Sequence, residues 1–193
     1  YKGQSLEYVR AGGSVVFVFM LAIVVAYLVM AAQFESFLHP LLIMLTVPLA
    51  TGGALLGLYL TGQTLNIFSQ IGLVMLIGLA AKNGILIVEF ANQLRDEGHP
   101  FEEALYRAAL LRLRPILMTS LTSVVGAIPL LLAFGAGAEA RFVLGVVIFF
   151  GVLVATLLTL FVLPAAYLLL ARNSSTPGRV SKKIRILEEQ ESA

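Results

Sequence analysis

The sequence contains no cysteine among its 193 residues, so disulfide bonds, thiolate metal sites and thiol catalysis are all excluded. Charge is also scarce, because Asp, Glu, Lys and Arg make up only 12% of the chain, about half of their usual share in soluble proteins. The chain has no glycine-rich nucleotide loop, no zinc-ligand spacing and no nucleophile–base pair. We therefore expect no enzyme activity, no metal, no cofactor and no nucleic-acid partner.

Apolar residues dominate what is present. They make up 59% of the chain and gather in long continuous runs, which is typical of an integral membrane protein. The runs predict an all-α fold: a polytopic membrane helix bundle in which five helices cross the bilayer. The predicted spans cover residues 14–32, 41–60, 70–92, 115–134 and 142–171.

A further helix, over about residues 100–113, is predicted between the third and fourth spans. Phe101, Leu105, Ala108 and Leu111 recur at helical spacing on one face. Acidic residues in the first turn and basic residues near the end complement the helix dipole. Such an amphipathic helix is expected to lie along the membrane surface before the chain enters the bilayer again.

Glycine, proline and histidine mark the breaks between spans. Gly98 predicts the end of one helix, and the proline that follows two residues later predicts the start of the next helix. Another proline likewise predicts the start of the second span. Gly53 and Gly57 have the spacing that lets a neighbouring helix approach closely. His39 and His99 each precede a proline in a short polar break, and we interpret both as turn residues.

Lysine and arginine are distributed unevenly between the two sides of the predicted bundle. By the positive-inside rule, the side with more of them is the cytoplasm, so we expect the C-terminus inside and Tyr1 outside. The polar tail, residues 172–193, is expected to be disordered in the cytoplasm. An N-terminus outside without a signal sequence predicts that the chain is a fragment. The basic residues of the inner side are Arg95, Arg107, Arg112, Arg114, Arg172, Arg179, Lys182, Lys183 and Arg185, against Lys2, Arg10 and Arg141 outside.

Lys82 stands out because it lies near the middle of the third span. A charge at the bilayer centre costs roughly 3 kcal/mol on insertion scales, so this lysine must be neutral, paired or able to snorkel to the interface. Glu89 lies on the same helix face but about 10 Å along the axis, and no other predicted span carries an acidic residue near mid-membrane. We infer that the partner of Lys82 lies in a missing part of the polypeptide or in a partner subunit.

Arg112 and Thr119 form a second candidate pair, since seven residues place them on one face of a continuous helix. An arginine at the membrane mouth and a threonine inside suggest, together with Lys82, a polar path that Asn83 and Glu89 could extend. Each residue also has a plainer interpretation. Arg112 would serve as a positive-inside anchor, and the Thr119 hydroxyl would bond to its own helix backbone.

Several runs carry a resemblance to a known family. They are GLAAKNGILIVEFAN at residues 78–92, RLRPILMTSL at residues 112–121, the GAGAEAR turn and the stretch QFESFLHPLLIMLTVPLA. Together they resemble the C-terminal transmembrane half of the resistance–nodulation–division (RND) transporters, and most closely the AcrB-like multidrug efflux pumps. The similarity covers about residues 11–171.

The resemblance implies that the spans correspond to helices eight to twelve of a twelve-helix membrane domain. It also implies that Lys82, Arg112 and Thr119 belong to a proton relay. The aspartates of that relay lie in the family's N-terminal half, which this sequence lacks, in agreement with the missing partner of Lys82. Residues 1–13 would then end a periplasmic domain. A homotrimer in the bacterial inner membrane, a periplasmic adaptor and an outer-membrane channel are further implications.

We therefore expect a drug/proton antiporter, a secondary transporter driven by the proton gradient, of which this chain supplies the C-terminal half. Two alternatives stay open on the residues alone. One is an RND relative that exports another cargo, such as a lipid or a metal. The other is a non-transporting membrane scaffold subunit in which Lys82 only pairs with a partner helix.

Overall fold

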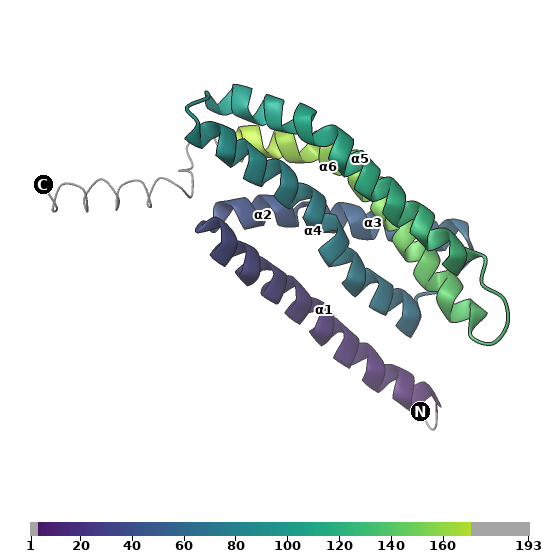
Figure 1. The fold of residues 1–193 in the computed structure, drawn as a ribbon. Coiled ribbons are helices and arrows are strands. Elements are labelled where there is room, and N and C mark those ends of the chain that lie inside the picture. The colour runs from purple at the N-terminus through teal and green to yellow at the C-terminus, as the bar shows by residue number, and fades with distance from the viewer. Residues whose placement is uncertain (1–3, 171–193) are drawn as a thin grey trace, which may run out of the picture.

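The computed structural model describes residues 4–170, with side chains from residue 17 onward. Every described element is a helix, which confirms the predicted all-α class (Figure 1). Five stretches of helix are long and apolar enough to cross a membrane, as predicted. The tail that was predicted to be disordered, residues 172–193, lies outside the described part of the chain.

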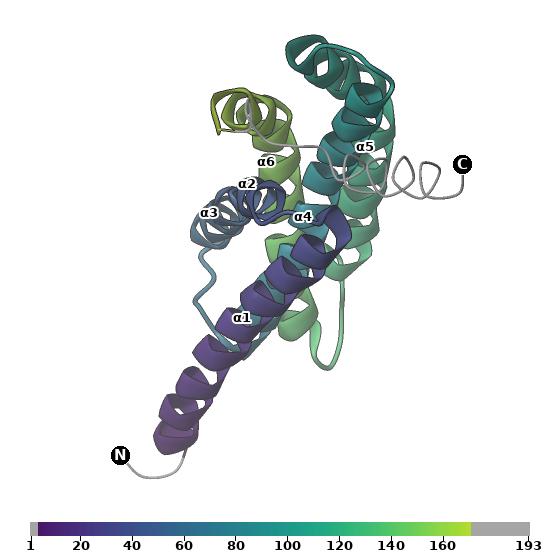
Figure 2. The same cartoon turned by 90° about the vertical axis from the view of Figure 1, so that its left-hand side faces the viewer.

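The first helix, α1 (Gln4–Phe34), begins ten residues before the predicted span and runs through it without a break. It packs against α4 and α2 and otherwise stands apart from the bundle (Figure 2). The chain then turns at Glu35, which has a left-handed backbone with φ of 46°, an uncommon conformation for a residue with a side chain. The Tyr27 hydroxyl donates to the Phe37 carbonyl at 3.1 Å and bridges this turn.

The second predicted span consists of two helices, α2 (Leu38–Met44) and α3 (Thr46–Leu60). The break has a local cause, because Pro48 has no N–H to bond the Met44 carbonyl four residues earlier. The Thr46 hydroxyl donates to the Ile43 carbonyl at 2.7 Å and satisfies one backbone acceptor at the break. The two pieces still form one apolar stretch from Leu38 to Leu60.

Helix α4 (Ile67–Asp96) contains the third predicted span and starts three residues before it. A reciprocal cap explains the early start. The Asn66 side chain accepts from the Ser69 backbone N–H at 2.9 Å, and the Ser69 hydroxyl accepts from the Asn66 backbone N–H at 2.8 Å. At the other end, Gly98 has φ of +99° just after the helix, which confirms the predicted stop at this glycine.

Helix α5 (Phe101–Leu131) replaces two predicted elements, the interfacial helix and the fourth span. The predicted boundary at residues 113–115 is therefore wrong. Pro115 removes a single backbone hydrogen bond, whereas a chain break would leave several backbone groups unpaired beside apolar helices. The helix continues through the proline as one bent rod (Figure 1). Leu111, predicted to share one apolar face with Phe101, Leu105 and Ala108, is 60% exposed, whereas Leu105 and Ala108 are buried.

Helix α6 (Ala138–Leu170) is the centre of the bundle, because it packs against α3, α4 and α5 (Figure 2). Its partners reach it across small residues. A Cβ atom added to Gly53 would lie 2.5 Å from Val154 Cβ, and one added to Gly57 would lie 2.6 Å from Phe150 Cβ. These contacts confirm the close helix approach that the glycine spacing predicted.

Candidate functional site

A buried polar network joins α4, α5 and α6 at mid-bundle. The Asn83 amide nitrogen donates to the Ser120 hydroxyl at 3.3 Å and to the Thr156 hydroxyl at 3.2 Å. The Thr156 hydroxyl lies 2.9 Å from the Ser120 oxygen and 2.7 Å from the Val152 carbonyl oxygen. Asn83, Ser120 and Thr156 are 4–6% exposed. The network therefore fixes three helices against one another through side chains that are almost fully buried.

Lys82 is the neighbour of Asn83 but points in a different direction around the helix axis. Its side chain is exposed, although it lies half-way along an apolar helix. Among the described residues, none forms an ion pair or a hydrogen bond with its ammonium group. The helix geometry explains the contrast, because successive residues point about 100° apart around the axis. When Asn83 faces the bundle, Lys82 faces its surface.

Thr119 meets Lys82 across the groove between α4 and α5. Both side chains line a small pocket of about 10 Å³, room for about one water molecule. The Thr119 hydroxyl donates to the Ile116 carbonyl at 3.2 Å, so its lone pairs stay available as acceptors. The remaining lining residues are Leu79, Asn83, Ser120, Ser123 and Val152.

Arg112 does not line this pocket. Seven residues separate it from Thr119, which is about 10 Å along α5. Its guanidinium lies over the Phe90 ring of α4, 4.4 Å from the ring centroid, in the arrangement of a cation–π contact. Its Nε atom is buried and has no hydrogen-bond partner among the described residues. Arg112 thus joins α5 to α4 at Phe90, about two helical turns along α4 from Lys82.

Glu89 faces a different opening. It lines a pocket of about 180 Å³ between α4 and the end of α1, together with Gln33 and Asn92. The structure therefore brings Lys82, Asn83 and Thr119 together and leaves Arg112 and Glu89 outside their pocket. Ser120 and Thr156 belong to the site but were not predicted. Their only signal in the sequence is a hydroxyl among apolar residues, which usually bonds to its own backbone.

The comparisons with known proteins decide the family. The profile of the AcrB/AcrD/AcrF family matches residues 1–171. The chain belongs to this family. It is also 46% identical over 174 residues to an uncharacterized transporter of Haemophilus influenzae. That match covers 86% of this chain and 17% of the relative, so the chain spans about a sixth of that protein's length.

Membership of the AcrB/AcrD/AcrF family confirms the resemblance seen in the sequence, because this is an RND family of transporters and not of enzymes. Together with the five apolar stretches, it identifies a multi-pass protein of a lipid bilayer.

A second polar cluster of this AcrB/AcrD/AcrF chain was missed by sequence reasoning. His39 was predicted to be a turn residue, but it lies inside α2 and is fully buried. The Tyr167 hydroxyl is 2.8 Å from His39 Nδ1 and donates to Asn92 Oδ1 at 3.1 Å. The Phe101 ring stacks on Tyr167, with centroids 5.6 Å apart. The cluster joins the starts of α2 and α5 to the ends of α4 and α6.

Replacing Tyr167 with phenylalanine is expected to destabilise the protein by about 1–3 kcal/mol, because the change removes a hydroxyl that bridges two buried polar side chains. Thermal unfolding of the full-length protein in detergent would measure the loss. Tyr59→Phe is the matched control, since Tyr59 is 84% exposed and should tolerate the same change. Equal unfolding temperatures for the two variants would contradict this role of Tyr167.

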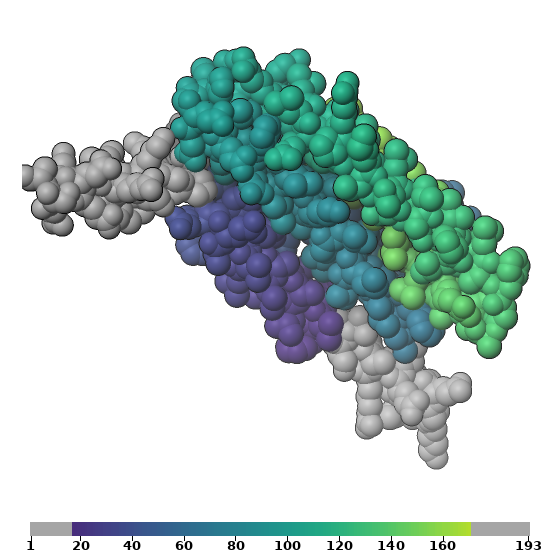
Figure 3. All heavy atoms as spheres, viewed as in Figure 1, coloured from purple at the N-terminus to yellow at the C-terminus, as the bar shows by residue number. Residues whose placement is uncertain are grey.

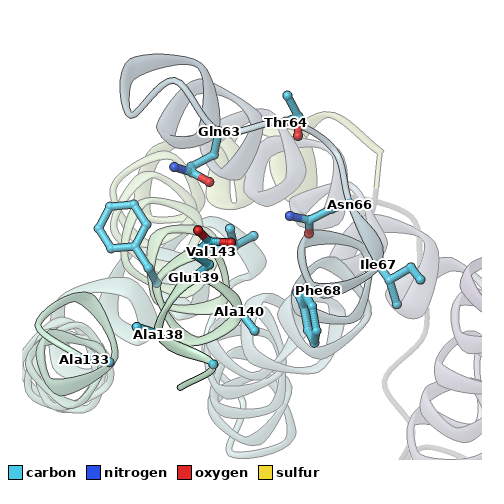
Figure 4. A pocket seen from close by; sticks show the side chains of 12 residues that line it. Gln63, Thr64, Asn66, Ile67, Phe68, Ala133, Ala138, Glu139, Ala140 and Val143 are labelled. Carbon is cyan, nitrogen blue, oxygen red and sulfur yellow. The ribbon is translucent and has the colours of Figure 1, made fainter. Parts of the chain in front are cut away.

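A larger cavity lies elsewhere in the part of the chain that the structure describes. It has a volume of about 840 Å³ and opens between the α3–α4 connection and the start of α6. Gln63, Asn66 and Glu139 surround it in Figure 4. Lys82 lies about 22 Å along the α4 axis from the start of that helix, and none of the predicted relay residues lines the cavity. It is therefore separate from the Lys82 site.

Proposed function

We propose that this chain supplies the C-terminal half of the membrane domain of a proton-driven drug/proton antiporter. The observation that carries the proposal is the exposed Lys82 side chain at the middle of α4, facing Thr119 of α5 across a polar groove. The domain would lie in the bacterial inner membrane with the C-terminus in the cytoplasm. The partner carboxylates of Lys82 would lie in the N-terminal half of the complete protein.

The energetics of Lys82 favour a carboxylate on a helix that covers this face. Leaving the ammonium group in hydrocarbon costs roughly 3 kcal/mol. A carboxylate about 4 Å away contributes about 4 kcal/mol of attraction at an effective dielectric constant of 20. One such pair is therefore enough to offset the cost of the buried charge. Lys82 would be held against the covering helix while that carboxylate is ionised.

Protonation of the carboxylate would then release Lys82. The attraction disappears, the ammonium group turns toward the hydroxyls of Thr119 and Ser123, and the covering helix repacks against α4 and α5. Each charge that crosses the membrane gains about 2.3 kcal/mol per 100 mV of membrane potential. This gain drives the cycle in one direction and is coupled to substrate export by the rest of the transporter.

The other predicted residues have different roles in this proposal. Arg112 brings a positive charge to this part of the bundle, and from its position over Phe90 it would favour the ionised form of the carboxylate. Asn83 does not titrate and is assigned to positioning. We leave Glu89 out of the relay because it lines the opening beside α1.

The partners of the complete protein follow from the resemblance to AcrB-like pumps. We propose a homotrimer that works with a periplasmic adaptor and an outer-membrane channel, and we assign residues 1–13 to the end of a periplasmic domain. A relative that exports lipids or metals would use the same membrane mechanism with another cargo.

The Arg112→Ala variant of the full-length transporter is expected to lower proton-driven export by about tenfold, which corresponds to the loss of one interaction of about 1.4 kcal/mol. Everted membrane vesicles that accumulate a fluorescent amphiphilic cation would measure the rate. Arg114→Ala is the matched control, because Arg114 lies two residues further on and is exposed. Only the Arg112 variant should lose activity.

Three outcomes would contradict parts of the proposed function. Accumulation that a protonophore leaves unchanged would exclude proton coupling. Wild-type proton-dependent export in the Arg112 variant would remove Arg112 from the relay. Proton-driven export of a lipid or a metal ion, without export of the amphiphilic cation, would show that the cargo is that lipid or metal ion and not a drug.

A further inference from the structure

Two hydrogen bonds fix the orientation of the Asn83 side-chain amide. A carboxamide has two N–H donors, and both are used, one by Ser120 on α5 and one by Thr156 on α6. Rotating α4 about its axis would break both bonds at once and leave a buried amide unpaired. Asn83 therefore fixes the rotation of α4 relative to two helices.

The two helices that form the groove repeat the same arrangement. On α4, the inward residue Asn83 is buried and its outward neighbour Lys82 is exposed; on α5, the inward residue Ser120 is buried and its outward neighbour Thr119 is partly exposed, and all four line the same pocket. The inward pair is hydrogen bonded directly. Because each inward residue is covalently joined to an outward one, the bond between Asn83 and Ser120 sets how Lys82 faces Thr119.

Thr156 completes this arrangement from α6. Its hydroxyl lies within hydrogen-bond distance of Asn83, Ser120 and the Val152 carbonyl of its own helix. It is 4% exposed and does not line the pocket that contains Lys82. Thr156 is thus hydrogen bonded to both inward residues and lies outside the lining of the pocket.

We propose that Thr156 is a positioning residue for Lys82, acting through Asn83 and Ser120. The proposal rests on the proposed function, because it assigns to Thr156 the task of holding the relay lysine in register with Thr119. Without the Thr156 hydroxyl, one N–H of Asn83 loses its acceptor. The amide then turns toward another acceptor, α4 rotates with it, and Lys82 no longer faces Thr119.

The chain offers a matched control one helical turn away. Thr159 is also on α6 and is 2% exposed, and its hydroxyl has no hydrogen-bond partner among the described residues. Replacing either threonine by valine removes one hydroxyl and keeps the shape of the side chain. Only the change at Thr156 removes a contact of the Asn83 network.

The test compares Thr156→Val, Thr156→Ser and Thr159→Val in the full-length transporter reconstituted in liposomes with an imposed proton gradient. We expect Thr156→Val to lower the maximal export rate of an amphiphilic cation by about tenfold with KM unchanged, as for the loss of one buried hydrogen bond. Thr156→Ser keeps the hydroxyl and should restore the rate to within about twofold. Thr159→Val should match the wild type.

A second readout does not depend on transport. A cysteine introduced at Ser123, which lines the Lys82 pocket, reacts with a thiol reagent at a rate set by the shape of that groove. We expect Thr156→Val to change this rate several-fold and Thr159→Val to leave it unchanged. If Lys82 proves irrelevant to transport, the labelling still tests whether Thr156 shapes the groove.

Equal export and equal labelling in the two valine variants would overturn the proposal. A smaller yield of folded Thr156→Val protein with a wild-type maximal rate and wild-type labelling would also overturn it, because that outcome describes a purely structural hydrogen bond.

Discussion

Replacing Lys82 with methionine is expected to abolish proton-coupled transport, by about a hundredfold or more, while leaving the full-length protein folded and inserted. Methionine keeps the length of the side chain and removes the charge. The loss of activity follows because the proposed covering carboxylate would then have no partner to bind and release. Export by everted vesicles under a proton gradient measures the loss of transport. The amount of folded protein in the membrane measures whether folding and insertion are unchanged.

The Lys82→Met change is expected to leave folding intact and to make membrane insertion easier, which distinguishes it from a change that only damages the protein. No described residue pairs with Lys82, so its removal breaks no bond within the described part of the chain. Insertion of α4 should become easier, because a lysine at the centre of a span costs about 2.5–3.5 kcal/mol. Wild-type export by Lys82→Met would exclude the relay. Loss of assembly together with unchanged export in the remaining protein would instead support the scaffold alternative.

The Gly53→Leu variant is expected to lose about 4 kcal/mol of stability or more, the range of severe overpacking. Even a Cβ atom at this position would lie 2.5 Å from Val154 Cβ and 3.1 Å from the Phe150 carbonyl oxygen. Neither atom is the flexible end of a side chain, so α3 must move away from α6. The fraction of full-length protein that stays monodisperse in detergent on heating measures the effect.

Gly52→Leu controls for this experiment, since it places the same side chain on the adjacent residue of α3. A Cβ atom at Gly52 meets nothing within 4 Å, and leucine is a better helix former than glycine by roughly 0.5–1 kcal/mol. The control should therefore be as stable as the wild type or slightly more stable. Equal losses at both positions would mean that the α3–α6 contact does not limit stability.

Features that depend on local sequence were predicted well. A lysine inside an apolar run is visible without any knowledge of the fold, and so is the spacing of Gly53 and Gly57. The helix stop at Gly98 was predicted because a left-handed backbone favours glycine. The start of α4 was placed too late because the polar connector hides the cap formed by Asn66 and Ser69.

Features that depend on distant contacts were not predicted. His39 reads as a turn residue beside a proline, and only Tyr167, 128 residues away, makes it a buried helical one. Ser120 and Thr156 join the site for the same reason, since they are 36 residues apart and meet only after α5 and α6 pack. The break predicted at Pro115 failed because the surrounding apolar helices penalise an interrupted backbone more than one missing bond.

The corner between α1 and α2 has a mechanical consequence. It is tied to the bundle by the Tyr27–Phe37 hydrogen bond and by buried His39. Helix α1 packs against α4 and α2, but most residues of its stretch Phe17–Phe34 stay uncovered. A 31-residue helix is about 46 Å long, so a rotation of about 5° at this corner moves its far end by about 4 Å. With this geometry, any rotation at the corner would be enlarged along α1 toward its N-terminal end.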